Sequence, residues 1–111
     1  MKIAIASDGN IISGHFGHCE GFNIYEIEEN EIIKEEFLQN PEHRPGYLPV
    51  FLKELNVNTI IANGMGATAQ ELFEDNNLQV VVGAIGECNN IIKEYINNNL
   101  KSTGSVCREH E

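Results

Sequence analysis

The 111-residue chain has few basic residues, few cysteines and no long hydrophobic run. Only 7 Lys and Arg stand against 17 Asp and Glu, and this formal net charge of -10 argues against nucleic-acid partners. The three cysteines are an odd number, and no secretion signal is evident, so we expect a reducing, cytoplasmic location. A helix that spans a membrane needs roughly 20 apolar residues, and their absence predicts a protein without a membrane partner.

The length suits a single domain that buries its own hydrophobic core. A bound metal would therefore serve function rather than folding. Hydrophobic periodicity is lost near the end, so we expect one domain over residues 1–100 and a flexible tail over residues 101–111.

The hydrophobic patterns predict an α/β fold with a mixed five-stranded sheet flanked by helices. Strand-like segments are Lys2–Ser7, Phe22–Glu28, Glu31–Phe37, Asn58–Ala62 and Val80–Ile85, and helical spacing covers residues 48–55, 67–75 and 91–100. The second and third strands flank Glu29-Asn30 and predict an antiparallel hairpin whose acidic residues face water. The last two strands alternate with helices, which predicts that they are parallel.

The segment His15-Phe16-Gly17-His18-Cys19 is the strongest candidate for a functional site. Imidazole and thiolate ligands suit zinc, copper, iron or an iron-sulfur cluster better than magnesium or calcium. Cys107 and His110 form a second group near the C-terminus, and a tail that folds back would add them to the same site. On the alternative reading, His18 caps a turn and Cys19 is a small buried side chain.

The carboxyl ends of parallel strands would bring three further segments to one edge of the sheet. These segments are Asp8, Asn63–Gly66 and Gly83–Gly86. Gly64 and Gly66 precede a helix, so backbone N–H groups at its start could face an anionic ligand. We expect Cys88, at the start of the last helix, to pack into the core.

The chain resembles the dinitrogenase iron-molybdenum cofactor biosynthesis family, which contains NifX-like proteins and domains similar to the NifB C-terminus. The resemblance rests on Met1–Asp8, His15-Phe16-Gly17, Asn40, Val57–Ala62, Gly64-Met65-Gly66, Leu78–Gly86 and the last helix to Leu100. It implies a ribonuclease-H-like three-layer fold that binds an iron-sulfur cluster or an iron-molybdenum cofactor precursor. It also implies that His15 is the favoured ligand within the His15-Phe16-Gly17 motif.

These observations favour a small, non-catalytic carrier that exchanges a metallocofactor with cofactor-assembly proteins. A carrier must release its cargo, and an open, incomplete ligand set suits that task. One alternative is a regulatory or interaction module in which metal binding is vestigial. A second is a metal-dependent hydrolase that uses Asp8, although two-metal hydrolysis needs several convergent carboxylates. The sequence leaves open the cargo and the oligomeric state.

Overall fold

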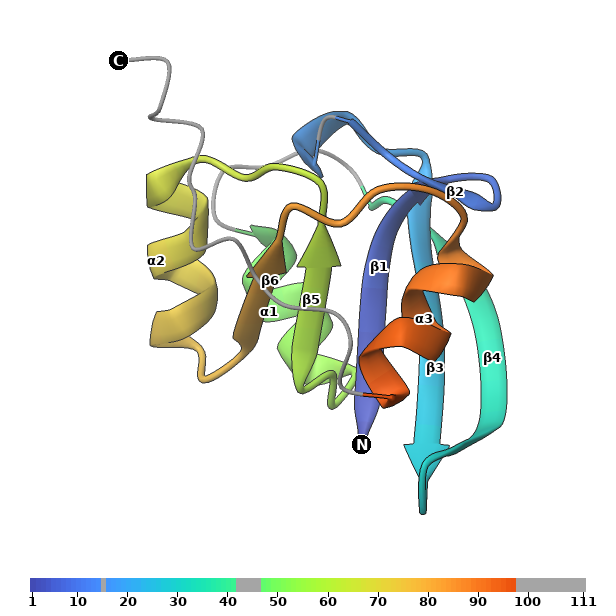
Figure 1. The fold of residues 1–111 in the computed structure, drawn as a ribbon. Helices are drawn as coiled ribbons and strands as arrows, with labels where there is room; N and C mark the ends of the chain where they lie inside the picture. Colours follow the sequence, from blue (N-terminus) through green and yellow to red (C-terminus); the bar gives the residue numbers. More distant parts are fainter. Residues whose placement is uncertain (15, 42–46, 98–111) are drawn as a thin grey trace.

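In a computed structural model, which describes residues 1–14, 16–41 and 47–97, the chain forms a mixed sheet flanked by helices (Figure 1). The strands are β1 (Lys2–Asp8), β2 (Ile11–Ile12), β3 (Gly21–Glu28), β4 (Glu31–Gln39), β5 (Thr59–Ala62) and β6 (Gln79–Val82). The strand order is β4-β3-β1-β5-β6, and β2 pairs with β1. β5 is parallel to both β1 and β6, as predicted, whereas β3 is antiparallel to β1 and β4.

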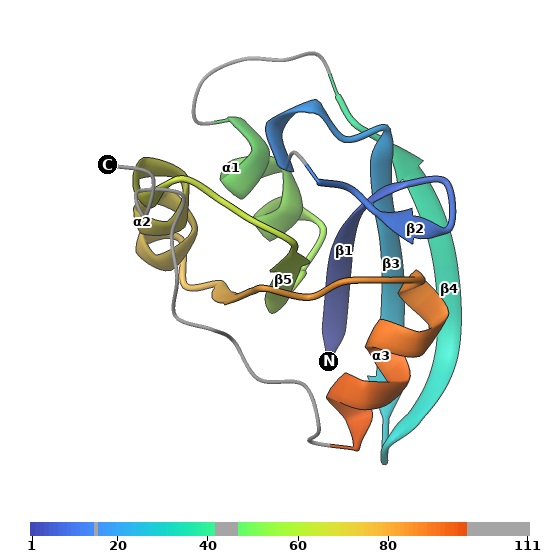
Figure 2. The same ribbon diagram turned by 45° about the horizontal axis from the view of Figure 1, so that its top comes forward.

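Three helices cover the two faces of the sheet (Figure 2): α1 (Tyr47–Glu54), α2 (Ala67–Asp75) and α3 (Cys88–Ile96). The side chains of β1 alternate between the faces, since Ala4 and Ala6 pack with residues of α1 and α2. Ile3 and Ile5 instead join the hydrophobic cluster under α3. The predicted α/β class with flanking helices is therefore confirmed.

β3 and β4 form the predicted hairpin. Glu29 and Asn30 both have positive φ angles, 52° and 65°, as a two-residue turn with the twist of type I′ requires. Almost all of β4 is exposed, so its acidic side chains face water as predicted. The register shifts between Glu26 and Ile27, which gives the edge strand a bulge of the kind that discourages sheet-to-sheet pairing.

The sheet has six strands rather than the five predicted. The additional strand β2 has two residues, too few for a sequence pattern, and it is held by pairing with the end of β1 and by a backbone bond to the loop before α3. Ile12 N–H donates to Gly86 O at 3.0 Å, and Ser13 N–H donates to Ala6 O at 2.9 Å. β6 also ends at Val82, earlier than predicted, because Gly83 adopts a φ of 95°.

Two expectations lie partly or wholly outside the described residues. α3 begins at Cys88, which the sequence placed at the start of this helix, and it is described as far as Ile96. Its predicted end at Leu100 and the tail over residues 101–111 lie outside the described residues. The narrower expectation of a ribonuclease-H-like fold stays a prediction. Among the described helices, none is long and apolar enough to cross a membrane.

Candidate functional site

The candidate site lies at the carboxyl edge of the parallel strands, where the loops after β1, β5 and β6 leave the sheet (Figure 1). The predicted site residues differ in their exposure. Phe16 and Cys19 are buried, Gly17 and Gly64 are half-buried, and His18 and Gly66 are exposed. His15, Cys107 and His110 lie outside the described residues.

Phe16 anchors the short 3-10 helix Phe16–His18 to the core. Its side chain is 9% exposed and lies between two other rings, from β3 and α2. The ring centroids are 6.3 Å from Phe22 and 5.4 Å from Phe73, the latter edge-to-face. Aromatic packing of this kind stabilises both the fold and the orientation of the attached backbone. Phe16 therefore anchors the described part of the candidate segment, the short helix Phe16–His18, to the core.

Cys19 follows this short helix and packs inward, with 4% of the residue exposed. Its thiol is in the same hydrophobic cluster as Phe16 and Met65. Burial, reinforced by the nearby charge of Asp8, raises the pKa of Cys19 to about 11. A metal binds the thiolate rather than the thiol, so coordination by Cys19 would require loss of a proton and a turn of the side chain outward.

The pKa of Cys19 predicts slow alkylation of this thiol at pH 8. The pKa rises from 9.0 to about 11, which reduces the thiolate fraction about a hundredfold. We expect mass spectrometry to show iodoacetamide labelling of Cys19 at least about a hundredfold slower in folded protein than in urea. A neutral buried thiol stabilises the fold up to about pH 9, and this contribution is lost as the pH rises through 11. Equal labelling rates in folded and unfolded protein would contradict the assignment.

The segment after Cys19 is held by a reciprocal pair of side chains. Glu20 N–H donates to Asp8 Oδ1 at 2.8 Å, and Gly9 N–H donates to Glu20 Oε1 at 3.1 Å. The sequence singles out Asp8 as a possible metal-binding carboxylate of a hydrolase. In the structure this carboxylate instead fixes the end of the candidate loop by a charge-assisted hydrogen bond.

Asn40 holds the same segment from the end of β4. Its backbone N–H donates to Glu20 O at 3.0 Å, and its Nδ2 donates to Cys19 O at 2.9 Å. Its Oδ1 is buried and is the one such side-chain atom without a hydrogen-bond partner in the described part of the chain. Leaving a buried carbonyl oxygen such as Asn40 Oδ1 without a hydrogen bond costs free energy. Sequence analysis placed Asn40 in the family pattern but gave it no role.

The loop Asn63–Gly66 leads into the N-terminus of α2. Gly66 is the N-cap, with φ -66° and ψ 157°, and no side chain caps the helix. A Cβ atom built at Gly66 would meet nothing within 4 Å, so the space beside the first turn is open. The uncapped N–H groups and the positive end of the helix dipole make this a suitable position for an anion.

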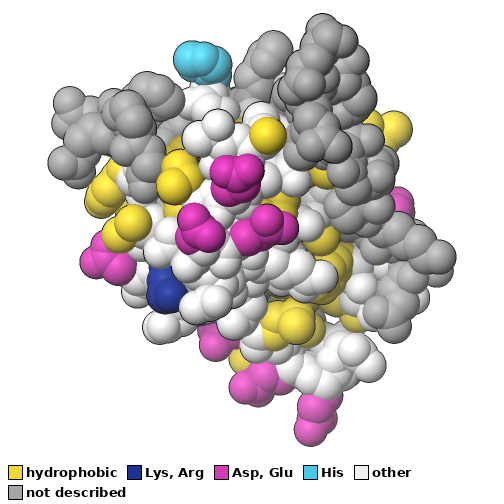
Figure 3. All heavy atoms as spheres, turned by 90° about the vertical axis from the view of Figure 1, so that its left-hand side faces the viewer, with side chains coloured by type: hydrophobic (Ala, Val, Ile, Leu, Met, Phe, Trp, Pro, Cys, Tyr) yellow, Lys and Arg dark blue, Asp and Glu magenta, His cyan; other side chains and the backbone are white. Residues whose placement is uncertain are grey.

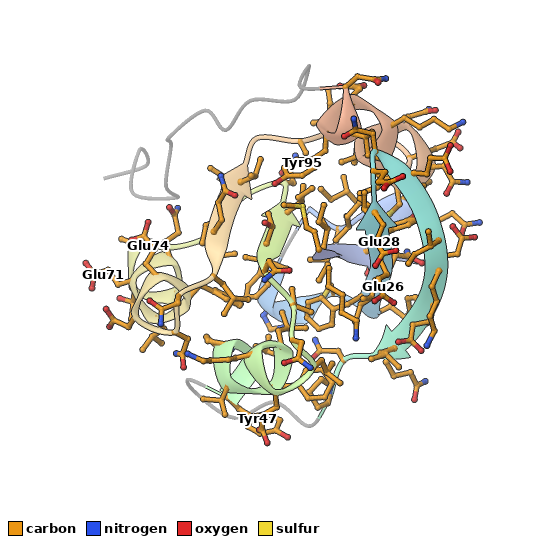
Figure 4. The ribbon with its side chains drawn as sticks, turned by 90° about the horizontal axis from the view of Figure 1, so that it is seen from below. Glu26, Glu28, Tyr47, Glu71, Glu74 and Tyr95 are labelled. Carbon is orange, nitrogen blue, oxygen red and sulfur yellow. The ribbon has the colours of Figure 1, made fainter. Side chains whose placement is uncertain are left out.

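The charge distribution of α2 strengthens this preference. No acidic residue lies in its first turn, whereas Glu71 lies at its middle and Glu74 and Asp75 lie in its last turn. Acidic side chains gather over the outer face of α2 (Figure 3), and Glu71 and Glu74 point away from the sheet (Figure 4). The N-terminal end of α2 therefore lacks the negative charge that would repel an anionic ligand.

The loops after β5 and β6 brace each other at the same edge. Gly83 N–H donates to Asn63 O at 2.9 Å, and Asn63 Nδ2 donates to Ala84 O at 3.0 Å. Ile85, between these contacts and α3, is 76% exposed. The predicted convergence of the two glycine-containing loops is confirmed.

The described residues do not by themselves form a metal site. No group of three or more His, Cys, Asp or Glu side chains is suitably placed within residues 1–14, 16–41 and 47–97. Cys88 is buried as expected, at 2% exposure, and burial raises the pKa of its thiol. The metal roles of His15, His18, Cys19, Cys107 and His110 therefore stay predictions.

Comparison with known proteins gives a match over nearly all of the described chain. The sequence profile described as dinitrogenase iron-molybdenum cofactor matches residues 1–98. The uncharacterised protein MJ0580 of Methanocaldococcus jannaschii is 33% identical over 106 residues, covering 91% of this chain and 90% of that protein.

Solved structures agree with this match. The crystal structure of PH0822 superposes with a TM-score of 0.87 at 29% identity, covering 95% of this chain and 96% of that one. The crystal structure of MJ0327 from Methanocaldococcus jannaschii gives a TM-score of 0.79 at 25% identity, again covering 95% and 96%. The similarity therefore extends over the whole architecture that positions the candidate site.

Proposed function

This chain belongs to the dinitrogenase iron-molybdenum cofactor family, and on that premise we propose that it is a non-catalytic carrier of an iron-sulfur or iron-molybdenum cofactor species. The family relates the chain to cofactor biosynthesis. The observation that supports the narrower proposal is that Phe16 belongs to the same hydrophobic cluster as Met65, the residue directly before the N-cap Gly66 of α2.

The two parts of this edge offer complementary chemistry. The His15–Cys19 segment contributes imidazole and thiol groups, which suit iron and sulfide-rich clusters. Gly66 is exposed and has open space beside it at the positive end of a helix, which suits an anionic cluster, and the half-buried Gly64 lies in the same loop. The unpaired Oδ1 of Asn40 can accept a hydrogen bond close to the same loop.

We assign different weights to the candidate ligands. His15 is the first candidate because it belongs to the family motif. His18 is the second candidate because it is exposed and lies in the same segment. Cys19 requires deprotonation and reorientation, so it would join only after cargo arrives. Cys107 and His110 would complete the set if the tail reaches this edge, and cofactor-assembly proteins would deliver and remove the cargo.

Anaerobic reconstitution tests the proposal. An iron-sulfur cofactor species is offered to wild type, His15→Ala and a chain truncated before Cys107, and bound iron and sulfide are measured with absorption spectra. We expect wild type to bind cargo, His15→Ala to lose most of it, and truncation to reduce what remains. His43→Ala is the matched control, since it removes an imidazole that lies outside the proposed ligand set.

Two outcomes would contradict the carrier proposal. Absence of bound iron in wild type would favour an interaction module with vestigial metal binding. Equal iron binding by wild type and His15→Ala would remove the His15 loop from the site. Retention of cargo by the truncated chain would limit the ligands to the domain itself.

A further inference from the structure

A hollow lies on the face of the sheet that α3 covers, between the hairpin and the start of this helix. Its volume is about 290 Å³, close to the lower limit of ordinary ligand pockets. Its lining residues are Asn10, Asn23, Tyr25, Glu35, Glu36, Phe37 and Asn89. Tyr25 belongs to the cluster under α3, whereas Phe16 and Cys19 belong to the cluster on the opposite face. The hollow is therefore separate from the proposed cargo site.

Asn23 lines the hollow, and hydrogen bonds fix the orientation of its side-chain amide. Its Nδ2 donates to Ser7 Oγ at 2.8 Å and to Gly9 O at 2.9 Å, and it lies 3.5 Å from Cys88 Sγ. In the described part of the chain, every hydrogen bond of this side chain runs through its nitrogen, which leaves Oδ1 available to a ligand. The site thus presents an acceptor whose position the fold determines.

The neighbouring side chains add further acceptors and an aromatic ring. Glu35 pairs across the ladder with Tyr25, and Phe37 pairs with Asn23, so all four project from one face of the sheet. The hydroxyl of Tyr25 donates to Asn89 Oδ1 at 3.3 Å. Burial, with the charges of Cys88 and Glu35, raises the pKa of Tyr25 to about 12, so the hydroxyl stays neutral at physiological pH.

The start of α3 does not turn this hollow into an anion site. Cys88 N–H already donates to Asn10 O at 2.8 Å, and the amides of Asn90 and Ile91 donate to Glu87 O. None of the lining residues is basic, and Glu35 supplies a carboxylate. The hollow therefore has carboxylates and no basic side chain in its lining, which favours a ligand that is cationic and donates hydrogen bonds.

We infer that this hollow binds the ammonium group of a small organic amine. An ammonium ion offers three donors, which match the carboxylate of Glu35, the amide oxygen of Asn23 and the hydroxyl of Tyr25. The exposed ring of Phe37 adds a cation–π surface. The net charge of -10 raises the local concentration of cations and supports their capture.

Titration with n-butylammonium, followed by NMR of backbone amides, tests the inference. We expect saturable shifts at Tyr25, Phe37 and Asn89, and no saturable response to n-butanol, which has the same chain without the charge. Glu35→Gln should weaken binding about tenfold through loss of a charge-assisted hydrogen bond.

The matched control is Glu31→Gln, which removes the same charge from the same exposed strand outside the hollow. It should change the affinity by less than about twofold, since exposed charges at a distance are screened. The inference is overturned if wild type gives no saturable shifts, or if both variants weaken binding equally. Iron binding should be unchanged in Glu35→Gln, because the cargo loop lies on the other face.

Discussion

Replacement of Phe16 by alanine is expected to destabilise the protein by about 3 kcal/mol and to abolish stable cargo binding. The ring is buried against Phe22 and Phe73, so its removal leaves a cavity between β3 and α2. The loss is large compared with the total stability of an ordinary domain, and it also removes the side chain that anchors the short helix Phe16–His18. Urea unfolding and anaerobic iron binding measure the two effects.

Phe37→Ala is the control for this change. It deletes the same ring from a side chain that is 39% exposed, so it should cost less than about 1 kcal/mol and leave iron binding intact. Equal destabilisation by the two variants would mean that Phe16 is not an anchor. Normal iron binding by folded Phe16→Ala would mean that the anchor does not position the ligands.

Gly66→Asp is expected to weaken cargo binding about tenfold or more while leaving the fold at least as stable as wild type. The new side chain has room, and its carboxylate can cap the first turn of α2, which no side chain now caps. The same carboxylate would compete with an anionic cluster for the helix N-terminus. Thermal unfolding and anaerobic iron analysis would report opposite directions of change.

Gly66→Asn separates charge from shape. Asparagine caps helices about as well as aspartate and has nearly the same size, but it adds no negative charge. We expect it to keep most of the cargo binding. If Asn and Asp reduce binding equally, steric exclusion is responsible. If neither variant reduces binding, the N-terminus of α2 is not part of the cargo site.

Local sequence patterns predicted most of the fold. The hairpin around Glu29-Asn30, the parallel β5 and β6, and the burial of Cys88 all followed from turn chemistry, strand–helix alternation and hydrophobicity. β2 did not, because it has two residues and Ile12 bonds to Gly86, which is distant in the sequence. Such pairings leave no periodic signal.

The candidate site was predictable as a set of loops but not as a set of contacts. The sequence placed Gly64 and Gly66 at the edge where the structure has them. It did not reveal that Asp8 and Asn40 would hold the backbone after Cys19, because each is one polar residue next to a turn or a proline. The inward orientation of Cys19 was one of two open alternatives, since a cysteine is compatible with either environment.

The turn between β3 and β4 extends from the edge of the sheet opposite the proposed cargo loops (Figure 1). Both of its central residues are exposed, and they join strands whose register is already fixed by pairing along their length. A fluorescent probe or a surface tether attached here would therefore report on cargo exchange without touching the loops that perform it. The turn of the hairpin is therefore a suitable attachment point for single-molecule measurements and for measurements on immobilised protein.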